Sequence, residues 1–346
     1  MRAHRFHPPN CPHTGNGKPD ADNPYRCKCT AHPHNPVSGD TASGDMTQFT
    51  TSLNATDGKN PLYAVSFEVT TSCAPESLLA KLPADAVGVV GLARSSLALP
   101  AQIADTQKVA NKFALCLPSG GAGVAIFGGG PLFLLPPGRP DVVATLAGET
   151  PLVKHGESPG YYISAEKGIA VNQAQVPIDG DGYGSAPLLV GLSSTIPYTA
   201  LRTDVYRAFI KAFDAAIAGR ARDTPAVAPF ELCYDSTQLG STRLGYAVPQ
   251  IDLMLQGGTN WTVFGGNSMA QVNENTACLA FVEMKGGDKQ AGYGGEGTEA
   301  PAVVIGGFQM ENNLLVFDEK NQRLGFSSLL WGRQTTCSNF DFTMAA

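Results

Sequence analysis

The chain has 346 residues, of which 43% are hydrophobic and only 16% charged, with 39 glycines and 25 prolines. This length is sufficient for about two domains, and turn residues between short β-branched runs predict mostly β structure. The net charge of −6 and the lack of a basic run argue against nucleic acid as a partner. No apolar stretch approaches the ~20 residues of a membrane-spanning helix, so we expect no membrane partner.

The first part of the chain predicts short strands separated by turns. Alternating polarity on both sides of Asp57-Gly58 is typical of a hairpin. In chain order we expect loop over 1–45, a hairpin over 46–72, a buried apolar strand over 87–93, a short helix that starts at Leu99 and ends before Lys112, and a strand pair over 113–118 and 123–130.

The second half of the chain, from about residue 161 onward, again predicts short strands separated by turns, and it adds one clear helix. Its apolar residues recur at four-residue spacing, with Thr203 as the expected N-cap and Gly219 as the expected stop. The residues of this apolar face are Val205, Phe209, Phe213 and Ile217. We expect strands at 161–163, 168–171, 253–255, 261–264 and 279–282, and a last hairpin over 314–326.

The eight cysteines are scattered rather than grouped in repeated Cys-x-x-Cys pairs, which favours disulfides in an oxidising compartment. Glycosylation sequons at Asn54 and Asn260 agree with secretion, whereas the start of the chain lacks the hydrophobic core of a signal peptide. One group of cysteines and histidines near the start is interpreted as a disulfide-held loop rather than a zinc site, so no metal is expected. This group is Cys11, His13, Cys27, Cys29, His32 and His34.

Several motifs in a fixed order carry a family resemblance. They are His34-Asn-Pro-Val-Ser-Gly, Gly91-Leu-Ala-Arg-Ser-Ser-Leu-Ala-Leu-Pro, Lys112-Phe-Ala-Leu-Cys-Leu-Pro, Leu192-Ser-Ser-Thr-Ile-Pro-Tyr-Thr, Ala228-Pro-Phe-Glu-Leu-Cys-Tyr-Asp and Val304-Ile-Gly-Gly-Phe-Gln-Met-Glu-Asn. From about residue 25 to the end, the chain resembles plant pepsin-like proteins of the TAXI-type xylanase inhibitor, basic 7S globulin and extracellular dermal glycoprotein group.

The resemblance implies a bilobal, mostly β, pepsin-like aspartic protease fold with a few short helices and a cleft between the lobes. We expect an N-terminal lobe over 1–145 and a C-terminal lobe of the xylanase inhibitor type over 146–346. The first lobe is expected to be incomplete, because the family's first strands and first Asp-containing loop have no counterpart here. The resemblance also implies an extracellular protein of the plant cell wall space, a monomer, and no cofactor.

The resemblance also assigns cysteine pairs. It joins Cys233 to Cys278 and Cys116 to Cys337, and the second pair would tie the lobes together. It places Cys11 and Cys29 at cysteines of the family. The pairing of Cys73 is left open, and Cys27 is an extra cysteine relative to the family.

The catalytic aspartates of a pepsin-like protease have no counterpart in this sequence. No Asp-Thr/Ser-Gly motif occurs, and Ser193 stands where the resemblance places the second aspartate. A serine cannot hold the proton that two carboxylates share in such an enzyme. Ser193, Ser194 and Thr195 also lack the adjacent base that a nucleophile needs, so we assign no catalytic residue.

These observations predict a binding protein rather than an enzyme. The resemblance implies an inhibitor of a microbial glycoside hydrolase, either a xylanase or a glucanase. The tail lacks the histidine that TAXI-type inhibitors insert into their target, so Leu330, Trp331 and Arg333 are the candidate contact residues. The alternatives are an aspartic endopeptidase, as the fold alone would suggest, and a truncated gene product that does not fold stably.

Overall fold

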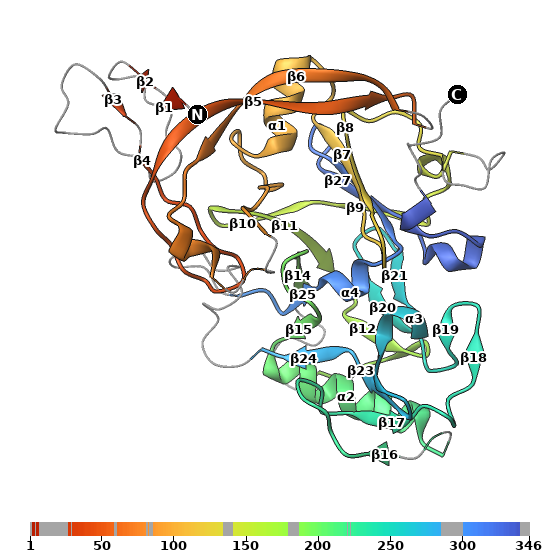
Figure 1. Cartoon of the computed structure of the whole chain (residues 1–346). Coiled ribbons are helices and arrows are strands. Elements are labelled where there is room, and N and C mark those ends of the chain that lie inside the picture. The colour runs from red at the N-terminus through yellow and green to blue at the C-terminus, as the bar shows by residue number, and fades with distance from the viewer. Residues whose placement is uncertain are drawn as a thin grey trace.

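The computed structural model describes residues 2–3, 5–6, 27–28, 30–58, 61–80, 82, 86–133, 141–178, 187–219, 221, 223–284 and 300–339. Strands predominate in these residues (Figure 1), which confirms the predicted mostly β class. The α-helices described are α1 (Leu99–Gln107), α2 (Thr203–Ile217), α3 (Gly265–Ser268) and α4 (Gly307–Met310). None of these helices is both long and apolar enough to span a membrane.

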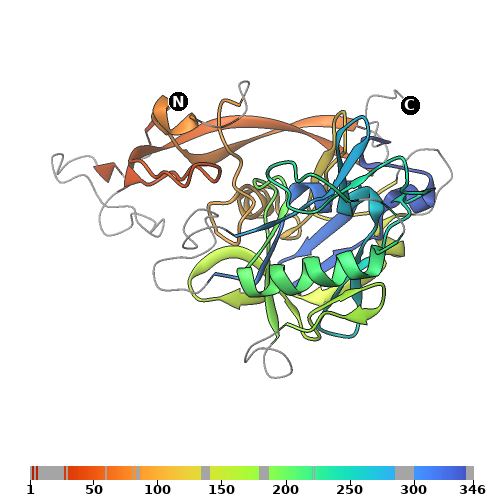
Figure 2. The same cartoon turned by 90° about the horizontal axis from the view of Figure 1, so that it is seen from below.

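A long two-stranded ribbon extends along one side of the molecule (Figures 1 and 2). It consists of β5 (Gly44–Thr56) and β6 (Pro61–Ser72), which pair antiparallel and confirm the predicted hairpin. Gly58 in its turn has a φ of +93°, and a Cβ there would lie 2.0 Å from the carbonyl oxygen of Pro131. Only glycine therefore fits this turn without strain.

Four two-residue strands lie within residues 1–45, where we expected only loop, so the prediction is wrong at these strands. β1 (Arg2–Ala3) and β4 (Thr30–Ala31) pair with β5, and β2 (Arg5–Phe6) pairs with β3 (Cys27–Lys28). The outer edge of β5 presents backbone hydrogen-bonding groups that a flanking segment can satisfy even without an apolar pattern.

One five-stranded sheet joins the two halves of the chain. Its order is β8-β7-β26-β27-β9, so a hairpin from the end of the chain lies between strands from the first half. The pairings confirm the predicted strand pair over 113–130 and the predicted last hairpin. The strands are β7 (Lys112–Cys116), β8 (Val124–Phe127), β9 (Gly148–Pro151), β26 (Leu314–Asp318) and β27 (Arg323–Phe326).

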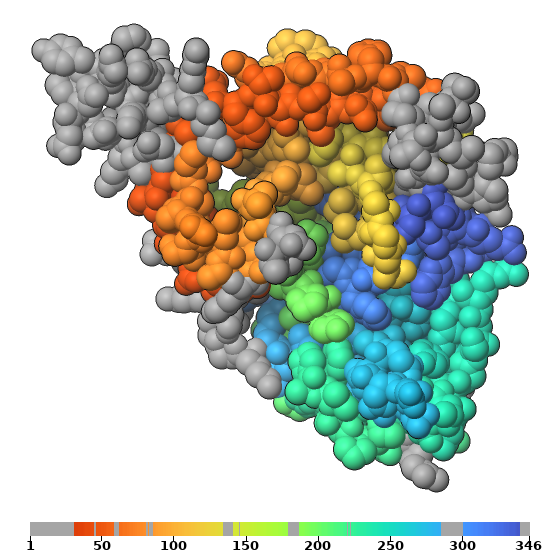
Figure 3. All heavy atoms as spheres, in the orientation of Figure 1, coloured from red at the N-terminus to blue at the C-terminus, as the bar shows by residue number. Residues whose placement is uncertain are grey.

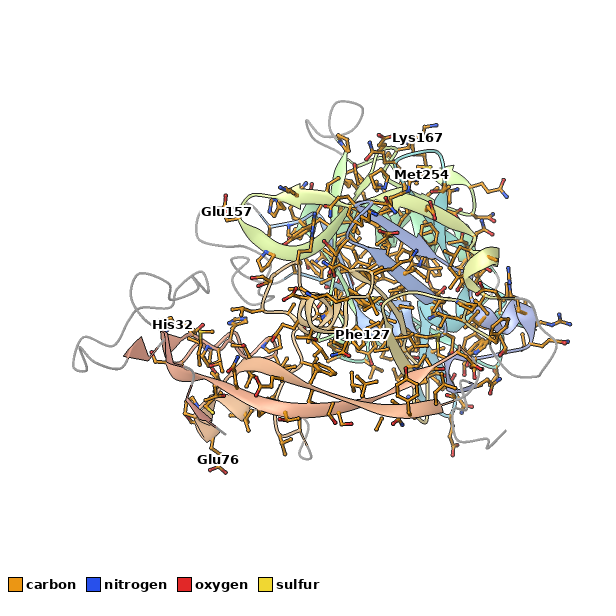
Figure 4. The ribbon with its side chains drawn as sticks, turned by 90° about the horizontal axis from the view of Figure 1, so that it is seen from above. His32, Glu76, Phe127, Glu157, Lys167 and Met254 are labelled. Carbon is orange, nitrogen blue, oxygen red and sulfur yellow. A yellow bond between two sulfur atoms is a disulfide. The ribbon has the colours of Figure 1, made fainter. Side chains whose placement is uncertain are left out.

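The ribbon attaches to this sheet through apolar contacts around α1. Ile103 of α1 packs with Phe67 and Val69 of β6, and Phe127 of β8 adjoins the same cluster. Figure 4 shows Phe127 in the space between the ribbon and the rest of the molecule. The helix starts at Leu99 as predicted and ends where Lys108 takes a left-handed conformation.

A six-stranded sheet forms the centre of the second half of the structure, which begins at β10. Its order is β10-β11-β14-β25-β15-β24, with parallel pairing of β14 to β25 and of β15 to β24. The strands are β10 (Val153–His155), β11 (Ser158–Ala165), β14 (Leu188–Leu192), β15 (Thr199–Leu201), β24 (Phe281–Glu283) and β25 (Val303–Ile305).

Smaller sheets complete the second half. One of them contains β12 (Ile169–Val171), β13 (Ala174–Gln175), β20 (Ile251–Met254) and β21 (Asn260–Val263). β16 (Asp223–Thr224), β17 (Cys233–Asp235), β22 (Met269–Asn273) and β23 (Thr276–Leu279) form another, and β18 (Ser241–Thr242) pairs with β19 (Gly245–Tyr246).

The amphipathic helix predicted in the second half is α2. The four predicted apolar residues are each at most 1% exposed, and Phe209 contacts Phe281 of β24 with ring centroids 4.9 Å apart. The predicted cap is wrong by one position, because Thr203 is the first helical residue and Arg202 is the N-cap. Gly219 follows the helix with a φ of +77°, in agreement with the predicted stop.

The predicted buried strand over 87–93 is wrong. Val87 is 93% exposed, Val89 is 50% exposed and Val90 is 64% exposed, and the segment belongs to no strand. A short apolar run forms a buried strand only where a neighbouring strand pairs with it. Among the residues that the structure describes, no strand pairs with this segment.

Candidate functional site

A cavity of about 280 Å³ lies where loops of the first part meet strands of the second half. Figure 3 shows the surface hollowed beneath the ribbon, between the orange first part and the green and blue second half. Segments that are far apart in sequence line this cavity: His34 and Pro36, Val89, Val90, Leu92 and Ala93, Phe113 and Leu115, residues 158–162, residues 192–195, Met310 and Phe317. Its place between the two halves makes it the candidate functional site.

Ser193 lies at the cavity wall, in the loop that follows β14. Its backbone N–H donates to the carbonyl of Ile305 at 2.9 Å, which fixes the loop against β25. The hydroxyl oxygens of Ser193 and Thr195 are 2.9 Å apart, and the Thr195 N–H donates to Ser193 Oγ at 3.2 Å. Ser193 is 7% exposed, so its hydroxyl serves mainly to satisfy its own loop.

A buried polar network lies a few residues further along the chain, where β15 meets α4. The side-chain oxygen of Gln309 accepts from both the backbone N–H and the hydroxyl of Thr199, each at 2.8 Å. The Gln309 amide donates to the carbonyls of Asn267 and Ala280. Because these hydrogen bonds are buried and satisfied, the network ties β15 firmly to α4.

The chemistry of the cavity wall is that of hydroxyl groups and apolar surface. Among the described residues that line it, none carries a carboxyl group. Burial raises the pKa of Tyr161, and the negative charge of Glu319 raises it further. Burial also raises the pKa of Tyr162, whose hydroxyl lies 2.7 Å from Ser158 Oγ. This wall can bind a ligand, but it does not offer the carboxylate pair that activates water in aspartic proteases.

A second pocket of about 270 Å³ adjoins the cavity, since Ser194 and Thr195 line both. Tyr198, Phe308 and Glu311 form its other side. Burial raises the pKa of Glu311 from 4.5 to about 7. The sequence gives no sign of this role for Glu311, because a glutamate after an apolar residue does not by itself indicate partial burial.

Both disulfides implied by the family resemblance are present. Cys116 of β7 pairs with Cys337, which lies 221 residues further along the chain, and Cys233 pairs with Cys278 across β17 and β23. Cys73 lies with its sulfur 3.6 Å from the hydroxyl of Thr47. Cys11 and Cys29 lie outside the described residues. In the described ranges no group of His, Cys, Asp or Glu side chains is arranged to hold a metal ion.

The candidate contact residues of the tail fall in a short 3-10 helix over Leu330–Arg333. Leu330 is fully buried beside Cys337, so its prediction as a contact residue is corrected: it is a core residue. The ring of Trp331 lies against Gly266, where a Cβ would come within 2.4 Å of it. Trp331 and Arg333 keep part of their surface exposed.

The two glycosylation candidates are accessible. Asn54 is exposed on β5, and Asn260 is exposed at the start of β21. Both positions leave room for a glycan, and glycosylation itself remains a prediction.

The mostly β architecture, with a cleft between two halves, defines a pepsin-like bilobal protein. The chain belongs to the xylanase inhibitor family. Residues 2–129 match the family model described as xylanase inhibitor N-terminal, and residues 160–328 match the one described as xylanase inhibitor C-terminal. This is a pepsin-like family whose members are typically non-catalytic.

Two curated relatives and two solved structures show the range of similarity. A rice (Oryza sativa subsp. japonica) protein named chitinase CLP is 69% identical, over 100% of this chain and 80% of the relative. Gamma conglutin 1 of Prunus dulcis is 38% identical, over 89% of this chain and 68% of the relative.

Among solved structures, one titled edgp matches 92% of this chain and 78% of its own, with a TM-score of 0.80 and 36% identity. Basic 7S globulin from soybean matches 99% of this chain and 85% of its own, with a TM-score of 0.77 and 26% identity. These comparisons confirm the family resemblance and the fold class.

Proposed function

We propose that this protein binds and inhibits a microbial glycoside hydrolase, either a xylanase or a glucanase, and does not cleave peptides. One observation carries the proposal: the cleft keeps a rigid pepsin-like loop scaffold, but Ser193 and Thr195 hydrogen-bond to each other where an aspartic protease needs a carboxylate. The match to both xylanase inhibitor models supports the kind of partner.

The part of the tail proposed to contact the enzyme is Trp331 and Arg333. Tryptophan and arginine are the side chains most often found at the energetic centre of protein interfaces. Arg333 also carries a positive charge, which suits the acidic active-site cleft of a glycoside hydrolase. We further propose secretion to the plant cell wall space, which the disulfides Cys116–Cys337 and Cys233–Cys278 support.

The test is binding and inhibition measured against purified microbial xylanases and glucanases. Arg333→Glu should weaken binding about tenfold or more if Arg333 is an interface anchor. Lys211→Glu is the matched control, because it makes the same change of charge on the exposed face of α2. Glu157→Gln, at the exposed edge of the β10–β11 turn (Figure 4), is a second surface control. The proposal would be overturned if the protein bound neither the xylanases nor the glucanases.

A second candidate function is action on chitin. The 69% identical rice relative is named a chitinase, and this is the observation that favours it. Hydrolysis of a glycoside requires two carboxyl groups about 5 to 9.5 Å apart, one of which has a raised pKa. Glu311 has a raised pKa, but no described carboxyl group lines the pocket with it. Release of sugars from chitin oligosaccharides by wild type, and its loss in Glu311→Gln, would favour this candidate.

A further inference from the structure

The pocket beneath the loop 194–198 contains an uncompensated acidic group. Glu311 lines the pocket, and its carboxyl group makes no hydrogen bond or ion pair with any residue that the structure describes. A half-buried carboxylate without a positive neighbour raises the free energy of the folded state, because it has lost hydrating water and no ion pair replaces it.

Hydrogen bonds hold the backbone of Glu311, from which this carboxyl group projects, in place. The Glu311 N–H donates to the carbonyl of Gly307, and its own carbonyl accepts from the amides of Asn267 and Asn313 at 2.7 and 3.0 Å. A bridge to Leu117 of the first half fixes the same residue from the other side. The side chain therefore projects from a rigid base, which is what a preformed binding site requires.

The walls of the pocket complement a positive charge. Tyr198 and Phe308 present aromatic rings in edge-on contact, 5.7 Å apart, and aromatic faces attract cations. Ser194 and Thr195 add hydroxyl oxygens that can accept hydrogen bonds. Apart from Glu311, the only titratable side chain that lines the pocket is Tyr198, and no lysine, arginine or histidine is among the described lining residues.

We propose that the Glu311 pocket accepts a cationic side chain, an arginine or lysine, from a protein partner. The guanidinium or ammonium group would pair with the Glu311 carboxylate while its stem packs against Tyr198 and Phe308. The net charge of −6 on this chain also favours a basic partner surface. The inference rests on the proposed function in one respect only, namely that the partner is a protein.

The test uses a small probe, so that it does not depend on which enzyme is the partner. Binding of N-acetyl-arginine methylamide to the whole chain is measured by NMR, with N-acetyl-norleucine methylamide as the uncharged counterpart. We expect binding of the arginine probe only, about tenfold or more weaker in Glu311→Gln and unchanged in Glu157→Gln. Because the carboxylate must be ionised, binding should also be about tenfold weaker at pH 6 than at pH 8.

Two results would overturn the inference. One is equal binding of both probes or of wild type and Glu311→Gln, provided that the variant retains the wild-type circular dichroism spectrum. The other is Glu311-dependent binding of chitotriose in place of the arginine probe, which would assign the pocket to a sugar. Failure to bind any xylanase or glucanase, with retained binding of the arginine probe, would remove the proposed function but leave this pocket in place.

Discussion

Phe113 of β7 and Phe317 of β26 stack face to face, with ring centroids 4.6 Å apart and ring planes 9° from parallel. Tyr161 of β11 contacts both rings, at 6.0 and 4.5 Å. All three residues line the cavity. The floor of the cleft is therefore also the joint between the first and second halves of the chain, so the stability of the fold and the shape of the site depend on the same contacts.

Removal of the Phe317 ring should destabilise the whole protein. Phe317→Ala leaves a void between Phe113 and Tyr161, and we expect a loss of about 3–5 kcal/mol in the free energy of unfolding. Urea unfolding followed by fluorescence measures this loss. Phe49→Ala is the control, because Phe49 is 37% exposed on β5 and should cost about 1 kcal/mol or less. Equal losses in the two variants would contradict the role assigned to the stack.

The disulfide between Cys116 and Cys337 should contribute more to stability than the one between Cys233 and Cys278. The first closes a loop with a sequence separation of 221 residues and the second one of 45. In the loop-entropy model the longer loop contributes about 5.4 kcal/mol and the shorter about 4 kcal/mol, a difference of about 1.4 kcal/mol. Paired Cys→Ser variants, compared by urea midpoint, test this order, and a lower midpoint for the Cys233–Cys278 variant would reverse it.

Local patterns in the sequence were sufficient for elements whose partners are close in the chain. The four-residue spacing from Val205 to Ile217 predicted α2, and alternation around Asp57-Gly58 predicted the β5–β6 ribbon. The run at 87–93 failed because its burial depends on a strand from elsewhere, which a local apolar pattern does not reveal. Two-residue strands such as β4 were not predicted, because they form only by pairing with the edge of β5.

The candidate site was predictable only in part. The family resemblance located the Ser193 loop and both disulfides, because these occur within recognisable motifs. The full burial of Leu330 and the partial burial of Glu311 arise from contacts between distant segments, for example the bridge from Glu311 to Leu117. Such contacts produce no periodic pattern in the sequence, so the pocket can be recognised only in the three-dimensional structure.

A single aspartate at position 193 should not create a protease. Ser193→Asp places a carboxyl group in the loop, but no described residue lining the cavity supplies the second carboxyl group that must share its proton. We expect neither wild type nor Ser193→Asp to show pepstatin-sensitive cleavage of denatured haemoglobin between pH 3 and 6, with pepsin as the positive control. Cleavage by wild type would support the endopeptidase alternative, and the Asp or Glu whose amide variant abolished it would be its catalytic group.

Replacement of Glu311 by glutamine should stabilise the protein at high pH and leave it unchanged at low pH. Burial raises the pKa of this carboxyl group from 4.5 to about 7, so the folded state binds its proton more tightly than the unfolded state does. The stabilisation from that proton is complete below pH 4.5 and is lost as the pH rises through about 7.

Glu311→Gln keeps the shape of the side chain without the charge. We therefore expect it to exceed wild type by about 1 kcal/mol at pH 8, a value reduced for the partial exposure of the group, and to equal it at pH 4. Thermal unfolding across this range measures the difference, and Glu157→Gln should show no such trend. A difference that stayed constant with pH would mean that Glu311 titrates like an ordinary surface glutamate, because only a change in protonation between folded and unfolded states produces the slope.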